Sequence, residues 1–436
     1  MLKSINRAAR PHAHRLLQCL TVAVRPLRLE ELAEVLAFDF DETQGGIPTV
    51  NAEWRREDQE YAVLSTCSSL ITVVHDGDSR VVQFSHFSVK EFLTSDRLAV
   101  SSGDISFHHI PPAPAHTILA QACLGVLLRS DDAGWETFVQ LFPLAEYASQ
   151  HWVEHALFED VSSRVKDGIE LLFDNDQPQF SRWVQNCHLD DSLPWLDDSL
   201  LDTAPLYYAA FCGLPDVIEK LIREHPEHVS ARGGPLGTAL HAASRMNHIK
   251  VVQSLLRHGA DVNASGMWGM TPLLFASCWA QPELVRRLLE HGADMSAKDE
   301  VEGSTSLHLA VGERQLEIVR TLLKNDADIN IRDNDGWTPL HLVSNSGHVD
   351  VVRFLLNHGA DPKARNSYQQ TPLHLASYQG NLEIARLLLE HGAEVDAEDE
   401  AGRTAYQDAL GSNRHKEVAR LLLAHGAESR TWDLTS

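Results

Sequence analysis

The sequence predicts a mostly α-helical protein whose second half is a solenoid of about seven short helical repeats. A small domain of helices and one hairpin precedes the solenoid, with a helical spacer between the two. Three observations support this prediction. A four-residue motif recurs with a period of about 33 residues, a second motif recurs at the same period, and the N-terminal part combines amphipathic helical patterns with one hairpin signal.

Two amphipathic helices are expected near the start of the chain. Leucines recur at helical spacing over residues 10–24, and residues 25–36 then give a break at Pro26 and a second helix. A third helix is expected over 57–69. The first acidic residue is Glu30, so a mitochondrial presequence is an alternative for this segment, but the pattern runs directly into the second helix and favours a folded domain.

A β-hairpin is expected after these helices. Residues 70–74 and 81–84 are rich in side chains that favour strands, and the Asp76-Gly77 pair between them accepts the positive φ of a tight turn. Helices followed by such a hairpin predict a winged helix.

The segment after the hairpin reads His86-Phe87-Ser88-Val89-Lys90-Glu91-Phe92-Leu93. With Arg25-Pro26-Leu27 and the order of elements, it resembles the winged-helix segment that follows the NACHT nucleotide-binding domain in fungal STAND-type proteins. Within it, Ser88 and Glu91 have capping-box spacing, which predicts a structural role for both.

The expected winged helix lacks the features of a DNA-binding domain, and the sequence lacks the motif of a nucleotide-dependent switch. The expected recognition helix carries Glu57, Asp58 and Glu60, which repel phosphate groups. No G-x-x-x-x-G-K-[ST] loop occurs in the chain, so ATP hydrolysis is not expected. Two origins stay open: the chain is the tail of a longer product with an upstream NACHT domain, or it is a free-standing derivative.

The spacer is expected to contain helices over 116–128, 137–155 and 163–173, followed by an acidic connector over 190–202. The second of these helices contains His151-Trp152-Val153-Glu154-His155, which matches the H-x-x-E-H pattern of zinc peptidases. A working site needs a third ligand from a matching fold, and the chain turns into repeats instead. We therefore expect an amphipathic helix and no metal site.

Two motifs recur in register through the second half. The first resembles Thr-Pro-Leu-His, in which Thr caps a helix and Pro occupies its first turn. It starts at Ala204, Thr238, Thr271, Thr305, Thr338, Thr371 and Thr404. The second is His-Gly-Ala or a variant, and it starts at His258, His291, Asn325, His358, His391 and His425.

These motifs resemble the ankyrin repeat, and the resemblance covers slightly more than half of the chain. It implies pairs of short helices joined by a tight turn, with projecting fingers between the pairs. The turn favours a residue that tolerates positive φ, but Ala280 and Arg314 occupy two of these positions, where local strain is expected. The remaining positions hold Gly213, Asn247, Gly347 and Gly380.

The first and last repeats depart from the pattern. The first ends in Glu224-His225-Pro226 where the others have His-Gly-Ala, and the last begins with Thr404-Ala405-Tyr406-Gln407. Both are expected to be caps that cover the apolar ends of the stack.

Composition restricts the ligands of this protein. The formal net charge is −24, which opposes binding to nucleic acid or anionic membrane, so a basic or neutral protein partner is expected. The six cysteines include no C-x-x-C pair, and no apolar run reaches the length of a membrane span. No cofactor, metal or small-molecule substrate is expected, and the expected location is cytoplasmic or nuclear.

The predicted architecture is an ankyrin-repeat solenoid over 201–430, preceded by a winged-helix-like domain over 1–107 and a helical spacer with acidic connector over 108–200. The resemblance implies a non-enzymatic adaptor or scaffold that binds a protein through the concave ankyrin surface. The alternative is a free-standing ankyrin transcriptional co-regulator.

The candidate partner-binding residues are large or cationic side chains expected on the groove, because aromatic residues and Arg dominate interface hot spots. For Trp279 and Tyr378 the alternative is packing between adjacent first helices. The candidates are Arg245, Met246, Trp268, Trp279, Trp337, Tyr368 and Tyr378.

Overall fold

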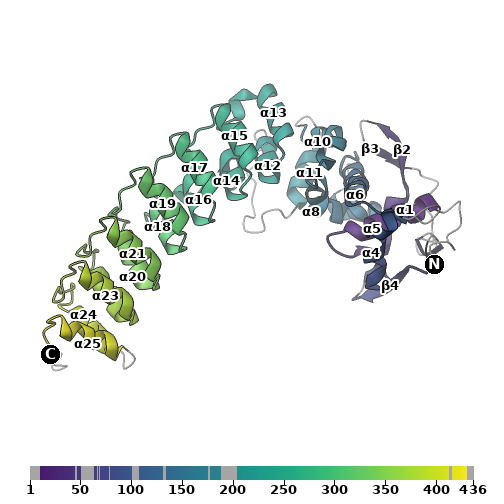
Figure 1. Ribbon diagram of the computed structural model, residues 1–436. Coiled ribbons are helices and arrows are strands. Elements are labelled where there is room, and N and C mark those ends of the chain that lie inside the picture. The colour runs from purple at the N-terminus through teal and green to yellow at the C-terminus, as the bar shows by residue number, and fades with distance from the viewer. Residues whose placement is uncertain are drawn as a thin grey trace. The chain divides into compact units, whose positions relative to one another are not determined.

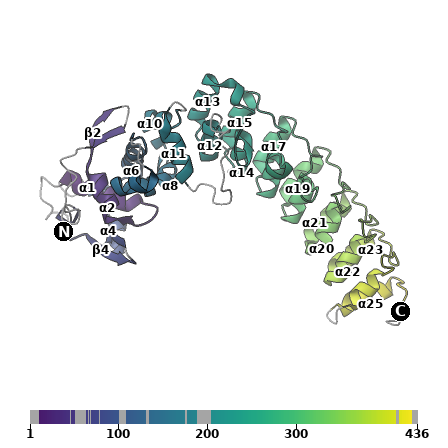
Figure 2. The ribbon, with the colours of Figure 1, turned by 180° about the vertical axis from the view of Figure 1, so that it is seen from behind.

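The computed structural model describes residues 10–44, 47–50, 63–65, 67, 69–77, 79–100, 108–130, 134–174, 177–187, 204–411 and 415–429. The chain divides into two compact units, Met1–Pro205 and Leu206–Ser436. Figures 1 and 2 show the elements of each unit from opposite sides.

The N-terminal unit begins with a winged helix. Helices α1 (Arg10–Val22) and α2 (Leu29–Leu36) pack on an antiparallel sheet with the strand order β1-β5-β4. The hairpin closes between Asp76 and Ser79, and Gly77 has a φ of 59°, as the turn chemistry predicts. The strands are β1 (Leu27–Arg28), β4 (Ile71–Asp76) and β5 (Ser79–Phe84).

A second hairpin is not among the elements that the sequence predicts. It joins β2 (Phe38–Gln44) to β3 (Ile47–Val50), and β3 packs against helix α6 (Pro112–Leu127) of the spacer. Its first strand begins with the alternation Phe38-Asp39-Phe40-Asp41, a period-two pattern that could have indicated a strand, and Phe38 is buried. The helix expected over 57–69 lies largely outside the described residues, and the acidic connector over 190–202 lies wholly outside them.

The expected capping box at Ser88 and Glu91 is wrong. Helix α4 (Phe87–Leu93) begins earlier, and His86 is its N-cap residue. The His86 Nδ1 accepts hydrogen bonds from the Ser88 amide at 3.2 Å and the Ser88 hydroxyl at 2.7 Å. The His86 imidazole thus caps the helix, whereas the sequence predicts the Ser88 hydroxyl as the cap. The short helix α5 (Asp96–Ala99) follows.

The spacer is helical, but its helices are more numerous than expected. Pro143 separates two helices where one was expected over 137–155, and an additional helix follows residue 173. The helices after α6 are α7 (Trp135–Leu141), α8 (Leu144–Ala156), α9 (Val161–Arg164), α10 (Lys166–Leu172) and α11 (Pro178–Asn186).

An aromatic cluster forms the core of this spacer. Trp152 and Trp183 meet edge to face with ring centroids 5.6 Å apart, and Phe173 and Phe180 complete the cluster. The Trp183 indole also donates a hydrogen bond of 3.0 Å to the Ser149 carbonyl, which satisfies its polar atom inside the core.

In its described residues, the C-terminal unit contains seven helix pairs in chain order, one for each predicted repeat. In Figures 1 and 2 the first helices of the pairs lie along one side of the stack and the second helices along the other. The pairs are α12 (Ala204–Cys212) with α13 (Pro215–Glu224), α14 (Ala239–Arg245) with α15 (Ile249–Arg257), α16 (Pro272–Cys278) with α17 (Pro282–Glu290), α18 (Ser306–Gly312) with α19 (Leu316–Lys324), α20 (Pro339–Ser346) with α21 (Val349–Asn357), α22 (Pro372–Gln379) with α23 (Leu382–Glu390), and α24 (Ala405–Leu410) with α25 (Lys416–Ala424).

The Thr and His residues of the first motif brace the stack. The His341 Nδ1 accepts hydrogen bonds from the Thr338 amide at 3.1 Å and hydroxyl at 2.8 Å, and its Nε2 donates to the Gln370 carbonyl of the next finger at 3.1 Å. His241, His308 and His374 repeat this arrangement. The motif thus caps a helix and joins neighbouring repeats.

The tight turns have the backbone conformation that their position requires. Gly213, Gly347 and Gly380 all have positive φ, and so do Ala280 and Arg314, each at 57°. The expected strain at the last two residues is therefore present in the backbone, because a side chain is costly in this conformation.

Candidate protein-binding surface

The seven candidate residues occupy two kinds of position in the repeat stack. Arg245, Met246, Trp279 and Tyr378 lie at or just after the C-terminal ends of first helices. Trp268, Trp337 and Tyr368 lie on the fingers that connect successive repeats.

Five of the candidates are well exposed. The side chains of Trp279 and Tyr378 keep 55% and 62% of their surface accessible, so they are not packed between adjacent first helices. Met246, Trp268 and Tyr368 are also exposed, at 41%, 61% and 52%. Aromatic residues and Met are enriched at protein–protein interfaces relative to the rest of the surface.

Backbone hydrogen bonds join the fingers into a continuous edge. The Glu300 amide donates to the Trp268 carbonyl at 2.8 Å, and the Glu400 amide donates to the Tyr368 carbonyl at 2.9 Å. Equivalent bonds link Asn334 to Glu302 and Ser367 to Asp335. The edge therefore holds the tips of the fingers at fixed spacing.

Trp268 has an unusual backbone conformation. Its φ is 56°, in the left-handed region that bulky residues rarely adopt, and it is followed by Gly269 at 71°. Residues held in such conformations cost free energy and are enriched at binding sites. The structure thus presents a large, exposed indole from a constrained turn.

Trp337 differs from the other finger residues. It lies at the base of its finger, half-buried, and its carbonyl accepts a hydrogen bond from the His308 Nε2 at 3.1 Å. Its ring lies 6.2 Å from that of His341. The Trp337 ring is therefore less accessible to a partner than the side chains of Trp268 and Tyr368.

Arg245 and Trp279 lie together across two adjacent repeats. The Arg245 guanidinium is 5.9 Å from the centre of the Trp279 ring, and Gln281 donates a 3.0 Å hydrogen bond to the Arg245 carbonyl. A guanidinium at this distance from an indole is stabilised by the charge distribution of the ring. The pair forms an apolar and cationic patch at the ends of α14 and α16.

The fingers are strongly acidic. Segments 261–270, 294–304, 328–337, 361–370 and 394–403 hold 14 acidic residues against 5 basic ones. Many of these carboxylates accept backbone hydrogen bonds inside the fingers, but four lie exposed near the exposed apolar residues. These four are Glu300, Glu302, Asp335 and Glu400.

The side chains of the H-x-x-E-H match in α8 do not gather their ligand atoms around one point. His155 is buried, and its two ring nitrogens are engaged, Nδ1 with the His116 Nδ1 and Nε2 with the Tyr147 hydroxyl, both at 2.8 Å. Burial lowers the pKa of His155 to about 3, so the ring is neutral. His151 instead meets Glu154 at 3.3 Å. The expectation of a structural helix fits this geometry.

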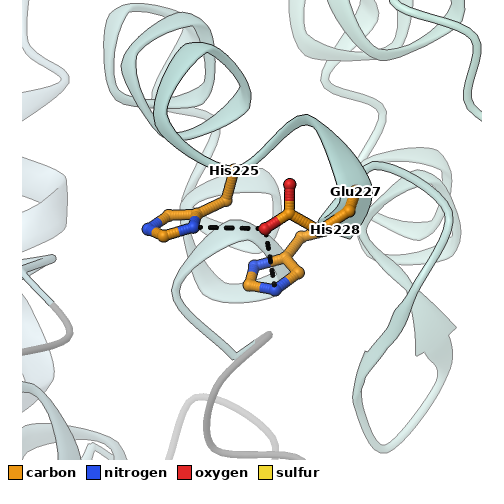
Figure 3. A group of neighbouring side chains, drawn as sticks. All are labelled: His225, Glu227 and His228. Carbon is orange, nitrogen blue, oxygen red and sulfur yellow. Dashed lines mark hydrogen bonds and ion pairs between the residues drawn. The ribbon is translucent and has the colours of Figure 1, made fainter.

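A different cluster of possible metal ligands lies at the end of the first repeat. The His225 Nδ1 and the His228 Nε2 lie 3.4 Å and 3.8 Å from the same oxygen of Glu227, as Figure 3 shows. The pKa of the Glu227 carboxyl is lowered, first by a hydrogen bond from its own backbone amide and then by the two imidazoles. Sequence reasoning singled out the departure from His-Gly-Ala at His225 but not this cluster.

Comparison with known families agrees with both halves of the structure. The family model for ankyrin repeats matches residues 206–299, 264–333, 293–366 and 364–431. The winged helix domain of GPI inositol-deacylase matches residues 2–103. No helix in the described part of the chain combines the length and apolar character that a bilayer crossing requires.

Several characterised proteins are similar to parts of the chain. "Azaphilone pigments biosynthesis cluster protein L" of Monascus ruber is 32% identical over 271 residues, which is 57% of this chain and 55% of that protein. Alpha-latrocrustotoxin-Lt1a of Latrodectus tredecimguttatus is 41% identical over 69 residues, 16% of this chain and 5% of the toxin. Serine/threonine-protein kinase VIK of Arabidopsis thaliana is 48% identical over 56 residues, 13% of each chain. The alignment with the Monascus protein thus spans about half of that relative.

Proposed function

Because this chain belongs to the ankyrin-repeat family, we propose that it is a non-enzymatic adaptor that binds a protein partner through the concave surface of its repeats. The observation that carries the proposal is the exposure of Trp268 and Tyr368 on hydrogen-bonded fingers, together with the Arg245–Trp279 patch at the ends of two first helices. Rigid aromatic groups contribute much of the binding free energy at protein interfaces.

The charge of the fingers supports a partner with a basic and apolar binding segment. Exposed Glu300, Glu302 and Glu400 surround the apolar tips, and Val301 between two of them is 67% exposed. A partner segment that carries Lys or Arg interleaved with apolar residues would be complementary to this surface. An acidic or phosphate-rich ligand would be repelled, which agrees with the net charge of −24.

The proposal is tested by comparing the proteins that three versions of the full chain retain in cells of its source. The wild type and a double variant, Trp268→Ala with Tyr368→Ala, are compared with the control Leu423→Ala, an exposed apolar residue on the last helix. We expect a partner that wild type and control retain and that the double variant loses at least about tenfold, because loss of one hot-spot residue costs about 2 kcal/mol.

If the double variant retains the same proteins in the same amounts as the wild type, the finger tips do not bind the partner. Circular dichroism of all three proteins shows whether the substitutions leave the fold intact.

We propose that the winged helix couples this binding surface to another domain or subunit. In this proposal the chain is the sensor tail of a NACHT-type signalling protein. The match over residues 2–103 supports this assignment over a free-standing transcriptional co-regulator. An immunoblot of the endogenous protein against recombinant chain of 48.5 kDa distinguishes them. A much larger band supports the signalling protein, and a matching band with nuclear accumulation supports the co-regulator.

A further inference from the structure

We propose that His225, Glu227 and His228 form a surface site for a divalent transition-metal ion of the zinc class. Two imidazole nitrogens and one carboxylate oxygen all lie within 4.8 Å of one another at the end of the first repeat. Two His and one Glu form a ligand set that zinc accepts in proteins, with a further position left for water or a donor from another molecule.

The local backbone brings these side chains together. Helix α13 ends at Glu224, and a single 3₁₀ turn, η6 (Pro226–His228), follows directly. Residues three apart in such a turn lie above one another, so His225 and His228 face the same side. Their rings are stacked with centroids 5.0 Å apart and an angle of 14° between the planes. Figure 3 shows one Glu227 carboxylate oxygen between the two imidazoles, facing a nitrogen of each.

His225 has lost the structural role of its counterparts in later repeats. His258, His291, His358 and His391 each follow a second helix, and the Nδ1 of each bonds a carbonyl four residues earlier at 2.8 Å. The His225 Nδ1 instead faces the Glu227 carboxylate at 3.4 Å. Pro226 stands after this histidine where the His-Gly-Ala motif has glycine, and the chain continues into the 3₁₀ turn η6. The His225 Nδ1 is therefore available as a metal ligand.

The spacing of the ligand atoms suits a small cation. Ligands at about 2.0–2.2 Å from a tetrahedral zinc ion lie about 3.3–3.5 Å from one another. The two nitrogen–oxygen distances, 3.4 Å and 3.8 Å, are close to this value, so rotation of side chains completes the site without backbone movement. His225 and Glu227 are exposed, which leaves the ion an entry path and an open position.

Metal binding to the full chain tests the proposal. The chain has 24 histidines, so a matched control for unspecific binding is needed. The test variant is His225→Ala with His228→Ala, and the control is His258→Ala with His291→Ala, which removes two imidazoles that already bond to backbone carbonyls. Each protein is dialysed against zinc chloride, and bound zinc is measured per chain.

We expect the wild type and the control to bind about one equivalent of zinc more than the test variant. The variant Glu227→Gln should weaken this binding at least about tenfold, because even indirect partners of a metal site contribute that much. Cobalt chloride provides a second readout, since a four-coordinate site gives intense visible absorption that the test variant should lack.

Equal zinc binding by the wild type and the test variant would overturn the proposal, and so would an equal loss in test and control variants. All substituted residues lie outside the buried core, so circular dichroism should show the same melting curve for each protein. The binding comparison is therefore made between folded chains.

Discussion

At the scale of the residue, the tight turn inside each repeat places one residue in the left-handed conformation. Glycine fills this position at Gly213, Gly347 and Gly380, where it meets no penalty from a Cβ atom. Ala280 has the same conformation, with a φ of 57°, and is exposed. The methyl group of Ala280 therefore adds strain and gains no packing.

We expect Ala280→Gly to raise the free energy of unfolding of the repeat unit by about 0.5–1 kcal/mol, because relief of left-handed strain exceeds the added chain entropy of glycine. Urea unfolding followed by circular dichroism measures the change. Gly347→Ala, at the equivalent turn, is the matched control and should lower stability. A lower midpoint for Ala280→Gly would contradict the assignment of strain.

Residue types predict the caps and turns of the repeats, but they do not predict which of two competing side chains makes a given hydrogen bond. Thr338 and Gly347 each have one role that suits their position, so cap and turn could be predicted from the sequence. His86 displaces Ser88 as a helix cap, and His155 turns inward to His116, because rotamers and burial decide these contacts. Neither the rotamer nor the burial of a side chain can be predicted from the spacing of residues along the chain.

At the scale of the element, one buried carboxylate fixes helix α2 in the winged helix. Glu31 has no exposed side-chain surface and accepts two hydrogen bonds from the Arg25 guanidinium, at 2.6 Å and 2.9 Å. It also accepts from the backbone amide of Arg28 at 2.7 Å, and the Arg28 side chain continues to Glu146 on α8 at 2.6 Å. The network joins the start of α2 to the spacer.

We expect Glu31→Ala to destabilise the N-terminal unit by about 3 kcal/mol, since removal of one partner leaves the Arg25 guanidinium without its buried counter-charge. The control is Glu30→Ala, which removes a partly exposed pair with Arg80 and should cost less than about 1 kcal/mol. Hydrogen exchange of peptides from α2 measures local stability. Equal exchange in the two variants would show that the network contributes little.

In the spacer, the periodicity of apolar residues predicts that helices form but not where they begin and end. Residues 137–155 read as one helix, but Pro143 divides them, because the proline ring cannot continue an α-helix through its interior. Helix α11 begins at Pro178 after a short break and buries Phe180 and Trp183. Its position depends on the aromatic cluster with Trp152, which is a contact between segments distant in sequence.

At the scale of the whole repeat unit, buried histidines repeat along the stack. His241, His308, His341 and His374 each use one ring nitrogen as an acceptor and the other as a donor, which only the neutral ring can do. Burial lowers the pKa of His241 and His341 to about 4, and it also lowers the pKa values of His308 and His374.

The sign of the pH dependence follows from these shifts. An unfolded histidine takes up a proton near pH 6.5 and the folded one near pH 4, so stability is fully present above 6.5 and is lost as the pH falls between these values. At pH 5 each of His241 and His341 should cost about 2 kcal/mol. Asp408 opposes them by about 1 kcal/mol, because burial raises its carboxyl pKa to about 6.

We therefore expect the urea midpoint of the repeat unit to fall markedly between pH 7.5 and pH 5, since four histidines outweigh one aspartate. His341→Gln should reduce this fall, because the amide of Gln407 already accepts the capping hydrogen bond of Thr404 in the last repeat. His358→Gln, at an exposed histidine after α21, is the control and should leave the pH dependence unchanged. A urea midpoint that does not change with pH would mean that protonation of the buried histidines does not destabilise the repeat unit.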